Sequence, residues 1–280
     1  MKIDLVQVAL DVGHALKEDV GSGDVTAALL TNSLIVEAEI ISREAMLVCG
    51  QPWVNEVFRQ IDPKIEIDWK VSEGEWLAAP TTLCIIHGTA SSVLTAERTA
   101  LNFLQTLSAT ATKTRQYAAQ LQHTKTKLLD TRKTIPGLRF AQKYAVQSGG
   151  GVNHRMGLYD AFLIKENHIK ACGSVAKAIS LARETHQHLL VEIEVETINE
   201  LREAFNAHPD RILLDNFSQE MLVEAVKMNQ PQYCELEASG GITLENIAAV
   251  AQTGVDFISV GSITKSLKAI DLSLLVREVL

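Results

Sequence analysis

Polar and charged residues follow each of six short apolar runs in the second half of the sequence. The runs span residues 127–129, 161–164, 189–195, 212–214, 234–238 and 257–260. The residues at or just after their ends are, in the same order, Thr131, Arg132 and Lys133; Lys165; Glu194 and Glu196; Asp215; Ser239, Gly240 and Gly241; Val260, Gly261 and Ser262. Short apolar runs between helical stretches predict buried parallel strands. Since α/β folds bind ligands at the carboxyl ends of such strands, the pattern predicts one site built from several strand ends.

Five cations belong to this predicted site: Arg132, Lys133, His154, Arg155 and Lys165. The stretch from residue 132 to 170 carries seven basic and two acidic residues, although the whole chain has a formal net charge of −8. Arginine binds carboxylates and phosphates with two parallel hydrogen bonds, and lysine supplies a point charge. The cluster therefore predicts a ligand with several negative charges, with a solvated helix face as the alternative.

Three carboxylates alternate with apolar residues at 191–195. Because side chains alternate between the two faces of a strand, Glu192, Glu194 and Glu196 are expected on one face. Such a row needs cations, either Mg²⁺ or basic side chains, and Asp215 on the next strand end could join it. The alternative is that single acids pair with the chain's own lysines and arginines.

Two glycine-containing turns connect a predicted strand to a predicted helix. They are Ser239-Gly240-Gly241 and Val260-Gly261-Ser262. Glycine allows the backbone to approach an anion closely, and the loops after the last strands of a barrel often bind phosphate. Two such turns in adjacent units predict a phosphate site.

Composition excludes several functional classes. The net charge of −8 disfavours nucleic-acid and anionic-membrane partners. No apolar run reaches about 18 residues, and Asp4 and Asp11 interrupt the N-terminal stretch, so we expect neither a membrane span nor a signal peptide. The four cysteines form no CxxC pair, which predicts reduced thiols and a cytoplasmic location. No serine-nucleophile elbow, Walker loop or HExxH occurs.

The chain has two regimes. Up to about residue 90, alternation predicts strands at 35–41, 46–49, 65–71 and 82–86, with a helix at 53–61. A long helix around residues 94–107 and a second at 110–121 follow. Helices at 174–185, 197–207, 218–228 and 244–253 then separate the short runs. Repeated strand–helix units predict a parallel α/β sheet, and polar groups after almost every strand favour a barrel over an open doubly wound sheet.

Several motifs resemble the quinolinate phosphoribosyltransferase (nicotinate-nucleotide pyrophosphorylase, carboxylating) family. They are EDVGSGDVT at 18–26, ERT at 97–99, DTRKT at 130–134, KYAV at 143–146, GGGVNHR at 149–155, LIKENH at 163–168, EIEV at 192–195, LDNF at 214–217, SGG at 239–241 and VG at 260–261. They cover residues 18–265 in order. One departure is visible, because Ala109 and Thr110 stand where the family usually has glycine and isoleucine.

The resemblance implies an N-terminal α/β sandwich domain and an incomplete (open) α/β barrel, paired as a homodimer. The sandwich would span residues 1–110, with residues 267–280 returning to it, and the barrel residues 111–266. It also implies quinolinate and phosphoribosyl pyrophosphate as substrates and Mg²⁺ as cofactor. The alternatives are a related phosphoribosyltransferase for another pyridine or aromatic acid, or a non-catalytic anion-binding barrel.

The resemblance also implies roles for residues of this sequence. Arg132, Lys133, His154, Arg155 and Lys165 would hold the carboxylates of quinolinate, Thr131 would also bind substrate, and Arg98 would reach into the partner's site. Glu194 and Asp215 would serve the ribose and Mg²⁺–pyrophosphate, with the metal bound directly or through pyrophosphate. Ser239, Gly240, Gly241, Val260, Gly261 and Ser262 would cradle the 5′-phosphate. Catalytic roles fall to Lys133, Lys165, Glu194 and Asp215.

Overall fold

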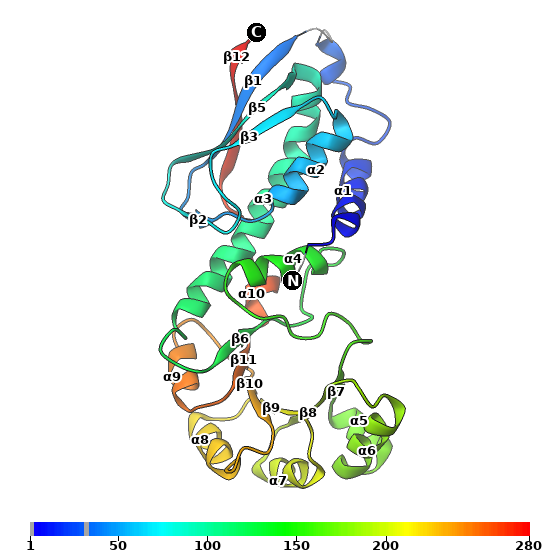
Figure 1. Ribbon diagram of the computed structural model, residues 1–280, viewed down its shortest axis with the longest axis vertical. Helices are drawn as coiled ribbons and strands as arrows, with labels where there is room; N and C mark the ends of the chain where they lie inside the picture. Colours follow the sequence, from blue (N-terminus) through cyan, green and yellow to red (C-terminus); the bar gives the residue numbers. More distant parts are fainter. Residues whose placement is uncertain (1–2, 31–33) are drawn as a thin grey trace. The chain divides into compact units, whose positions relative to one another are not determined.

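The chain forms two compact units (Figure 1). The computed structural model describes residues 3–30 and 34–280. Unit 1 comprises Met1–Arg115, Ile135–Gly149 and Thr264–Leu280, and unit 2 comprises Gln116–Thr134 and Gly150–Ile263. Residues 135–149 thus belong to unit 1, although the predicted barrel domain included them. Gln142 accounts for this, since it accepts from Ile135 N at 2.8 Å and donates to Thr264 O at 2.8 Å.

Unit 1 is an antiparallel sheet with helices. The sheet order is β12-β1-β5-β3, and a separate pair joins β2 to β4. The strands are β1 (Ile35–Ser42), β2 (Met46–Leu47), β3 (Glu66–Trp69), β4 (Trp76–Leu77), β5 (Thr81–Thr89) and β12 (Leu272–Val279). The helices are α1 (Leu5–Asp19), η1 (Ala27–Leu29), α2 (Gln51–Ile61), α3 (Ala90–Ala119) and α4 (Arg139–Ser148). β12 pairs with β1, so the end of the chain completes the sheet that the N-terminal half begins.

The core of unit 1 is apolar. Alternate residues of β1 are buried, namely Val36, Ala38 and Ile40, as the period-two pattern predicts. α2 buries Trp53 and Phe58 on its apolar face. Burial of this kind stabilises a fold by roughly 25 cal/mol for each Å² of apolar surface removed from water.

α3 runs unbroken for 30 residues, so the prediction of two separate helices was wrong. Its polar residues lie inside unit 1 rather than at a helix boundary. Ser108 exchanges hydrogen bonds with the backbone of Cys49, accepting from N and donating to O at 3.0 Å each. The hydroxyl of Thr112 accepts from Leu47 N at 2.8 Å. These contacts satisfy backbone groups of the β2 region, and so polar side chains are retained in the middle of a buried helix.

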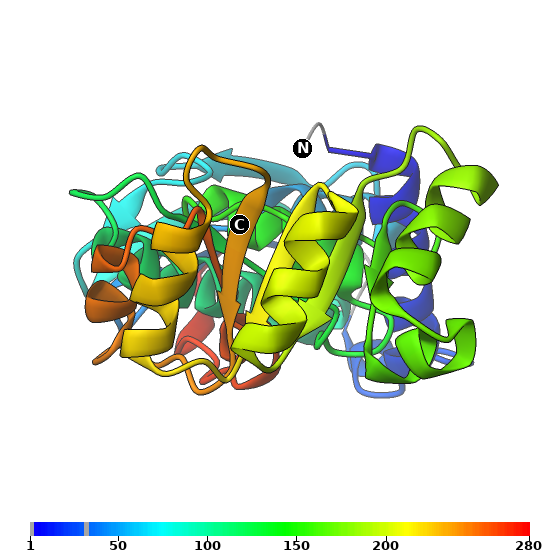
Figure 2. The same ribbon diagram turned by 90° about the horizontal axis from the view of Figure 1, so that it is seen from below.

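Unit 2 is a six-stranded parallel sheet, and all six strands that the apolar runs predicted are confirmed. The order is β6-β11-β10-β9-β8-β7. The strands are β6 (Lys127–Leu129), β7 (Phe162–Ile164), β8 (Val191–Val195), β9 (Arg211–Asp215), β10 (Glu235–Ser239) and β11 (Phe257–Ser259). The helices are α5 (Glu166–Cys172), α6 (Val175–Thr185), α7 (Ile198–Ala207), α8 (Gln219–Met228), α9 (Ile247–Gln252) and α10 (Ser262–Lys265). Figure 2 shows α6, α7 and α8, coloured green to gold, along one face of the strands.

The sheet of unit 2 does not close on itself, which confirms the predicted incomplete barrel. β6 and β7 are its two edges, and no ladder joins them among the described residues. An isolated bridge between Leu129 and Val152 extends the β6 edge. Within residues 3–30 and 34–280, no helix is long and apolar enough to cross a membrane.

Candidate active site

The parallel strands of unit 2 end at one edge of their sheet, and this edge gathers the predicted residues. Thr131, Arg132 and Lys133 follow β6; Lys165 follows β7; Glu194 lies near the end of β8; Asp215 ends β9; Ser239 ends β10, with Gly240 and Gly241 after it; Val260, Gly261 and Ser262 follow β11. The register places Ser239 beside Asp215. Polar and charged residues from six separate chain segments therefore lie along the carboxyl edge of one sheet.

Arg132 and Arg155 are two partly buried cations that interact with each other. The Nε atom of each is buried and has no hydrogen-bond partner. Burial lowers the pKa of Arg155, and the nearby positive charge of Arg132 lowers it further. A buried N–H group without a partner costs free energy, on the order of 1–3 kcal/mol. The pair is thus suited to an anionic ligand that supplies the missing acceptors and neutralises both charges.

His154 is fixed by two acids. Asp130 is fully buried and accepts from His154 N at 2.8 Å and from Asn153 Nδ2 at 2.6 Å. The imidazole Nε2 lies 2.7 Å from Glu192 Oε2. The backbone of His154 is therefore held by Asp130, which follows β6, and its ring is held by Glu192 on β8.

Lys165 and Glu194 make an ion pair across the ends of β7 and β8. This contact brings the predicted cations and acids to the same edge. Glu192 and Glu194 lie on one face of β8, as the alternation predicts, but each contacts a different basic side chain of the protein, which was the alternative to a shared metal. Glu192 bonds His154, whereas Glu196 is exposed beyond the end of β8, where its N–H donates to Glu200.

The loop after β10 is locked to the end of β9. Gly240 has φ of +91°, and a Cβ built there would lie 2.1 Å from Asn216 Oδ1. Asn216 itself has φ of +56°, donates its N–H to Ser239 O at 2.9 Å, and donates Nδ2 to Asp215 Oδ2 at 2.8 Å. Only glycine fits at position 240, because any side chain would collide with Asn216.

The loop after β11 lies against the loop after β6. A Cβ on Gly261 would meet Lys133 Cδ at 2.9 Å and Thr131 Oγ1 at 3.3 Å. Ser262 Oγ lies 3.4 Å from the hydroxyl of Tyr117. The backbone at Gly261 thus reaches the predicted cation loop without an intervening side chain, as a close approach to phosphate requires.

A network of charges lies beneath this edge, on the strands themselves. Glu237 Oε2 is 3.8 Å from His154 Nε2 and 3.4 Å from Arg211 Nη1. Arg211 also bonds Glu235 at 2.8 Å and lies 4.0 Å from the Phe257 ring centre. Burial and, to a smaller extent, the charge of Glu192 raise the pKa of Glu237 to about 8. Burial also raises the pKa of Glu192.

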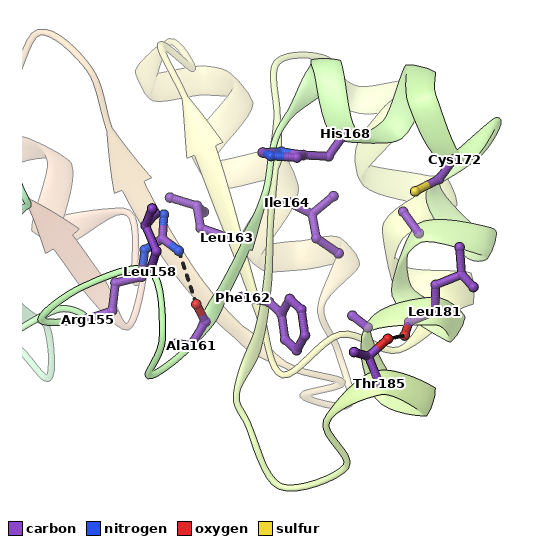
Figure 3. Close-up of a pocket in the computed structure, with 12 residues that line it drawn as sticks. Arg155, Leu158, Ala161, Phe162, Leu163, Ile164, His168, Cys172, Leu181 and Thr185 are labelled. Carbon is purple, nitrogen blue, oxygen red and sulfur yellow. Dashed lines mark hydrogen bonds between the residues drawn. The ribbon is translucent and has the colours of Figure 1, made fainter.

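A separate pocket of about 390 Å³ lies between β7 and helices α5 and α6 (Figure 3). Leu158, Phe162, Ile164 and Leu181 give it an apolar lining, and Arg155 at its rim donates to Ala161 O at 3.1 Å. An apolar lining does not suit a polyanion, so the strand-end edge remains the candidate site.

Arg98 lies on α3 in unit 1. Its side chain is 61% exposed and is 3.5 Å from Glu97 on the same helix. The other predicted site residues belong to unit 2.

Three contributors were absent from the predicted site: Asp130, Arg211 and Glu237. Asp130 was only part of a motif, although an acid directly after a buried strand is a usable signal. The alternation of Glu235 and Glu237 along an apolar run resembles that of Glu192 and Glu194, and it could have indicated a second acidic face.

An open parallel α/β sheet with partly buried arginines and glycine loops at its carboxyl edge defines an enzyme class that handles phosphorylated or carboxylated polyanions. Two family descriptions match nearly the whole chain: the N-terminal domain of quinolinate phosphoribosyl transferase over residues 24–108, and its C-terminal domain over residues 110–275. The chain belongs to the quinolinate phosphoribosyltransferase family.

Individual relatives are similar over almost their full length. A probable nicotinate-nucleotide pyrophosphorylase (carboxylating) of Bacillus subtilis is 40% identical over 264 residues, which cover 94% of this chain and 91% of that protein. Quinolinate phosphoribosyltransferase (decarboxylating) 1b of Nicotiana tabacum is 40% identical over 93% of this chain and 79% of its own length. The structure of the nicotinate-nucleotide pyrophosphorylase of Francisella tularensis has a TM-score of 0.95 at 48% identity, covering 99% of this chain and 98% of that one.

Proposed function

We propose that this chain transfers the phosphoribosyl group of phosphoribosyl pyrophosphate to quinolinate. The products are nicotinate mononucleotide, carbon dioxide and pyrophosphate, a step of NAD biosynthesis. The observation that carries the proposal is the pair of buried, unpartnered Nε groups on Arg132 and Arg155, at the same edge as the glycine loops. Full-length similarity to carboxylating and decarboxylating relatives supports the choice of substrate.

Binding and orientation are the first tasks of the site. Arg132 and Arg155 bind the two carboxylates of quinolinate, which relieves the repulsion between their own charges. His154, Lys133 and Lys165 are the other basic residues that contact quinolinate. The pyridine nitrogen is thereby held towards the ribose, and holding two reactants in one geometry removes part of the entropic barrier.

Two glycine loops and two carboxylates form the phosphoribosyl side of the site. The loops Ser239–Gly241 and 260–262, with Thr131 beside Gly261, cradle the 5′-phosphate through backbone N–H groups. As the bond to pyrophosphate breaks, positive charge develops on the ribose carbon. The carboxylates of Glu194 and Asp215 stabilise this charge.

Glu194 and Asp215 also suit Mg²⁺, because they present hard oxygen ligands at the ends of adjacent strands. When bound, Mg²⁺ would neutralise the charge on the departing pyrophosphate. Attack by the pyridine nitrogen makes the ring cationic. The ring then accepts the electron pair left by the departing carbon dioxide, and the ring carbon takes up a proton.

A homodimer with a shared site is part of the proposal. Arg98 supports it, since this guanidinium is exposed on α3. The test mixes an Arg98→Ala chain with a Lys165→Ala chain. Mixed dimers should regain activity that neither variant has alone, because one of their two sites keeps both residues. Equal inactivity of the mixture and the separate variants, with dimers present, would contradict a shared site.

One assay tests the reaction. The protein is incubated with quinolinate, phosphoribosyl pyrophosphate and Mg²⁺, and pyrophosphate and carbon dioxide are measured. Equal amounts of the two products support the proposal. Pyrophosphate without carbon dioxide, obtained with nicotinate or another aromatic acid, indicates the related phosphoribosyltransferase. No turnover with any acid indicates the anion-binding barrel. A cytoplasmic location remains a prediction.

A further inference from the structure

The His154 ring is held from the interior of the sheet. Its Nε2 atom is 2.7 Å from Glu192 Oε2, and only 8% of the His154 side chain and 1% of the Glu192 side chain are exposed. A carboxylate accepts hydrogen bonds, whereas an imidazole N–H donates one. This contact therefore fixes both the plane of the ring and the nitrogen that carries its proton.

The backbone of His154 is held independently of its ring. Asp130 accepts from His154 N, and Asn153 binds the second oxygen of the same carboxylate. Loss of the Glu192 contact would therefore remove the 2.7 Å partner of Nε2 while the Asp130 contact to the loop backbone stays. A change at Glu192 is expected to alter orientation rather than folding.

A second buried carboxylate lies next to Glu192, whose Oε1 atom is buried without a hydrogen-bond partner. Glu237 on β10 interacts with the Glu192 side chain and lies 3.8 Å from the same imidazole nitrogen. Arg211 on β9 bonds Glu237, and Glu235 bonds Arg211. The charged groups around the ring are thus Glu192, Glu237 and Asp130, with Arg155 next in the chain and Arg211 behind Glu237.

We propose that Glu192 is a positioning residue for the dicarboxylate substrate. It acts only through His154, by holding the imidazole in one orientation with the proton on Nε2. The neighbouring acid on the same face, Glu194, bonds Lys165 instead, so the two glutamates of β8 contact different cations. This inference rests on the proposed function, because quinolinate is the ligand that His154 would contact.

The kinetic test is a double-mutant cycle with Glu192→Gln and His154→Gln. Glu192→Gln should raise the KM for quinolinate roughly tenfold, the size of one hydrogen bond to a charged group. The KM for phosphoribosyl pyrophosphate should stay unchanged. Adding Glu192→Gln to His154→Gln should have no further effect, because a residue that acts through another has nothing left to act on. Additive effects, or equal changes in both KM values, would overturn the proposal.

Glu235→Gln is the matched control, since Glu235 belongs to the same network but lies at its exposed end, on the far side of Arg211. It should leave the KM for quinolinate unchanged. A rise equal to that of Glu192→Gln would mean that the network acts by general stability and not by orientation.

A spectroscopic readout separates this inference from the reaction itself. The ¹⁵N chemical shifts of the His154 ring, assigned by comparison with His154→Gln, report which nitrogen carries the proton in the ligand-free protein at alkaline pH. Wild type should carry it on Nε2, and Glu192→Gln should show a mixture, since an amide can donate as well as accept. Identical tautomers in both proteins would overturn the inference. Absence of turnover by wild type, with the expected tautomers, would instead count against the proposed reaction alone.

Discussion

The inner layers of the two units are built from opposite materials. In unit 1, β1 and α2 bury Val36, Ile40, Trp53 and Phe58 in a hydrocarbon core. In unit 2, one face of β8 buries Glu192, and one face of β10 buries Glu237. His154 contacts the first of these acids and Arg211 the second. Buried charges contribute little net stability, because desolvation offsets their attraction. Unit 1 is therefore built for stability, whereas unit 2 gives up stability to hold fixed charges beside a ligand.

The largest expected effect is on the hydrocarbon side of this comparison. Trp53 is fully buried and donates Nε1 to Asp11 at 3.2 Å. Trp53→Ala should cost about 3–5 kcal/mol of unfolding free energy, because it leaves a cavity and removes the hydrogen-bond donor to Asp11 Oδ2. Denaturant unfolding measures the loss. Trp76→Ala is the control, because the Trp76 side chain is half exposed. An equal loss of unfolding free energy in this variant would show that Trp53 is not a core residue of unit 1.

The second effect is on binding rather than folding. Arg155→Ala should raise the KM for quinolinate roughly 100-fold, as expected when one partner of a buried charge pair is removed. Its unfolding midpoint should not fall, because repulsion between Arg155 and Arg132 is relieved. Steady-state kinetics and thermal unfolding measure the two quantities. Arg183→Ala, which removes an outer ion pair with Asp210, should leave the KM unchanged. Unchanged quinolinate affinity in Arg155→Ala would remove this residue from the site.

A third effect concerns pH and the buried acids of unit 2. Folding raises the pKa of Glu237 to about 8, so its contribution to stability is complete below its unfolded pKa and is lost as pH rises through about 8. Glu237→Gln cannot ionise, and its unfolding midpoint should therefore fall less than that of wild type between about pH 6 and about pH 9. Each kcal/mol of this difference corresponds to roughly 2–4 °C. Parallel pH profiles would show that Glu237 is not buried as an acid.

The smallest effect is expected for an exposed ion pair of unit 1. Arg277 on β12 bonds Glu39 on β1 at 2.7 Å, but its side chain is nearly half exposed. Solvent screens such pairs, and so Arg277→Ala should leave the unfolding midpoint unchanged within error. A clear drop would mean that charge stabilises unit 1 as well, which would blur the contrast between the two units.

Hydrophobic period alone predicted the parallel sheet of unit 2 and part of unit 1, but not α1, α4 or β4. Alternation located β1, and short apolar runs located the six strands of unit 2. The extent of α3 could not be predicted, because Ser108 and Thr112 look like boundary residues until their backbone partners on distant segments are known. β12 was not predicted as a strand either, since its residues become a strand only by pairing with β1, more than 200 positions away.

The site was predicted by residue type more readily than by pairing. Cations and acids at strand ends were identified, but which acid serves which cation depends on register. Glu192 and Glu194 are equivalent in the sequence pattern. Only the positions of His154 and Lys165 in space distinguish them. The departure at Ala109 and Thr110 is accommodated within α3, where Ala109 is buried and Thr110 donates to Thr106 O.

The fit of Gly240 against Asn216 has a mechanical consequence. The space that a Cβ would need at Gly240 is filled by the amide that donates to the carboxylate of Asp215. A side chain at position 240 would therefore displace Asn216 and, with it, the contact that orients Asp215, so that a substitution on one strand end would disturb an acid on the next.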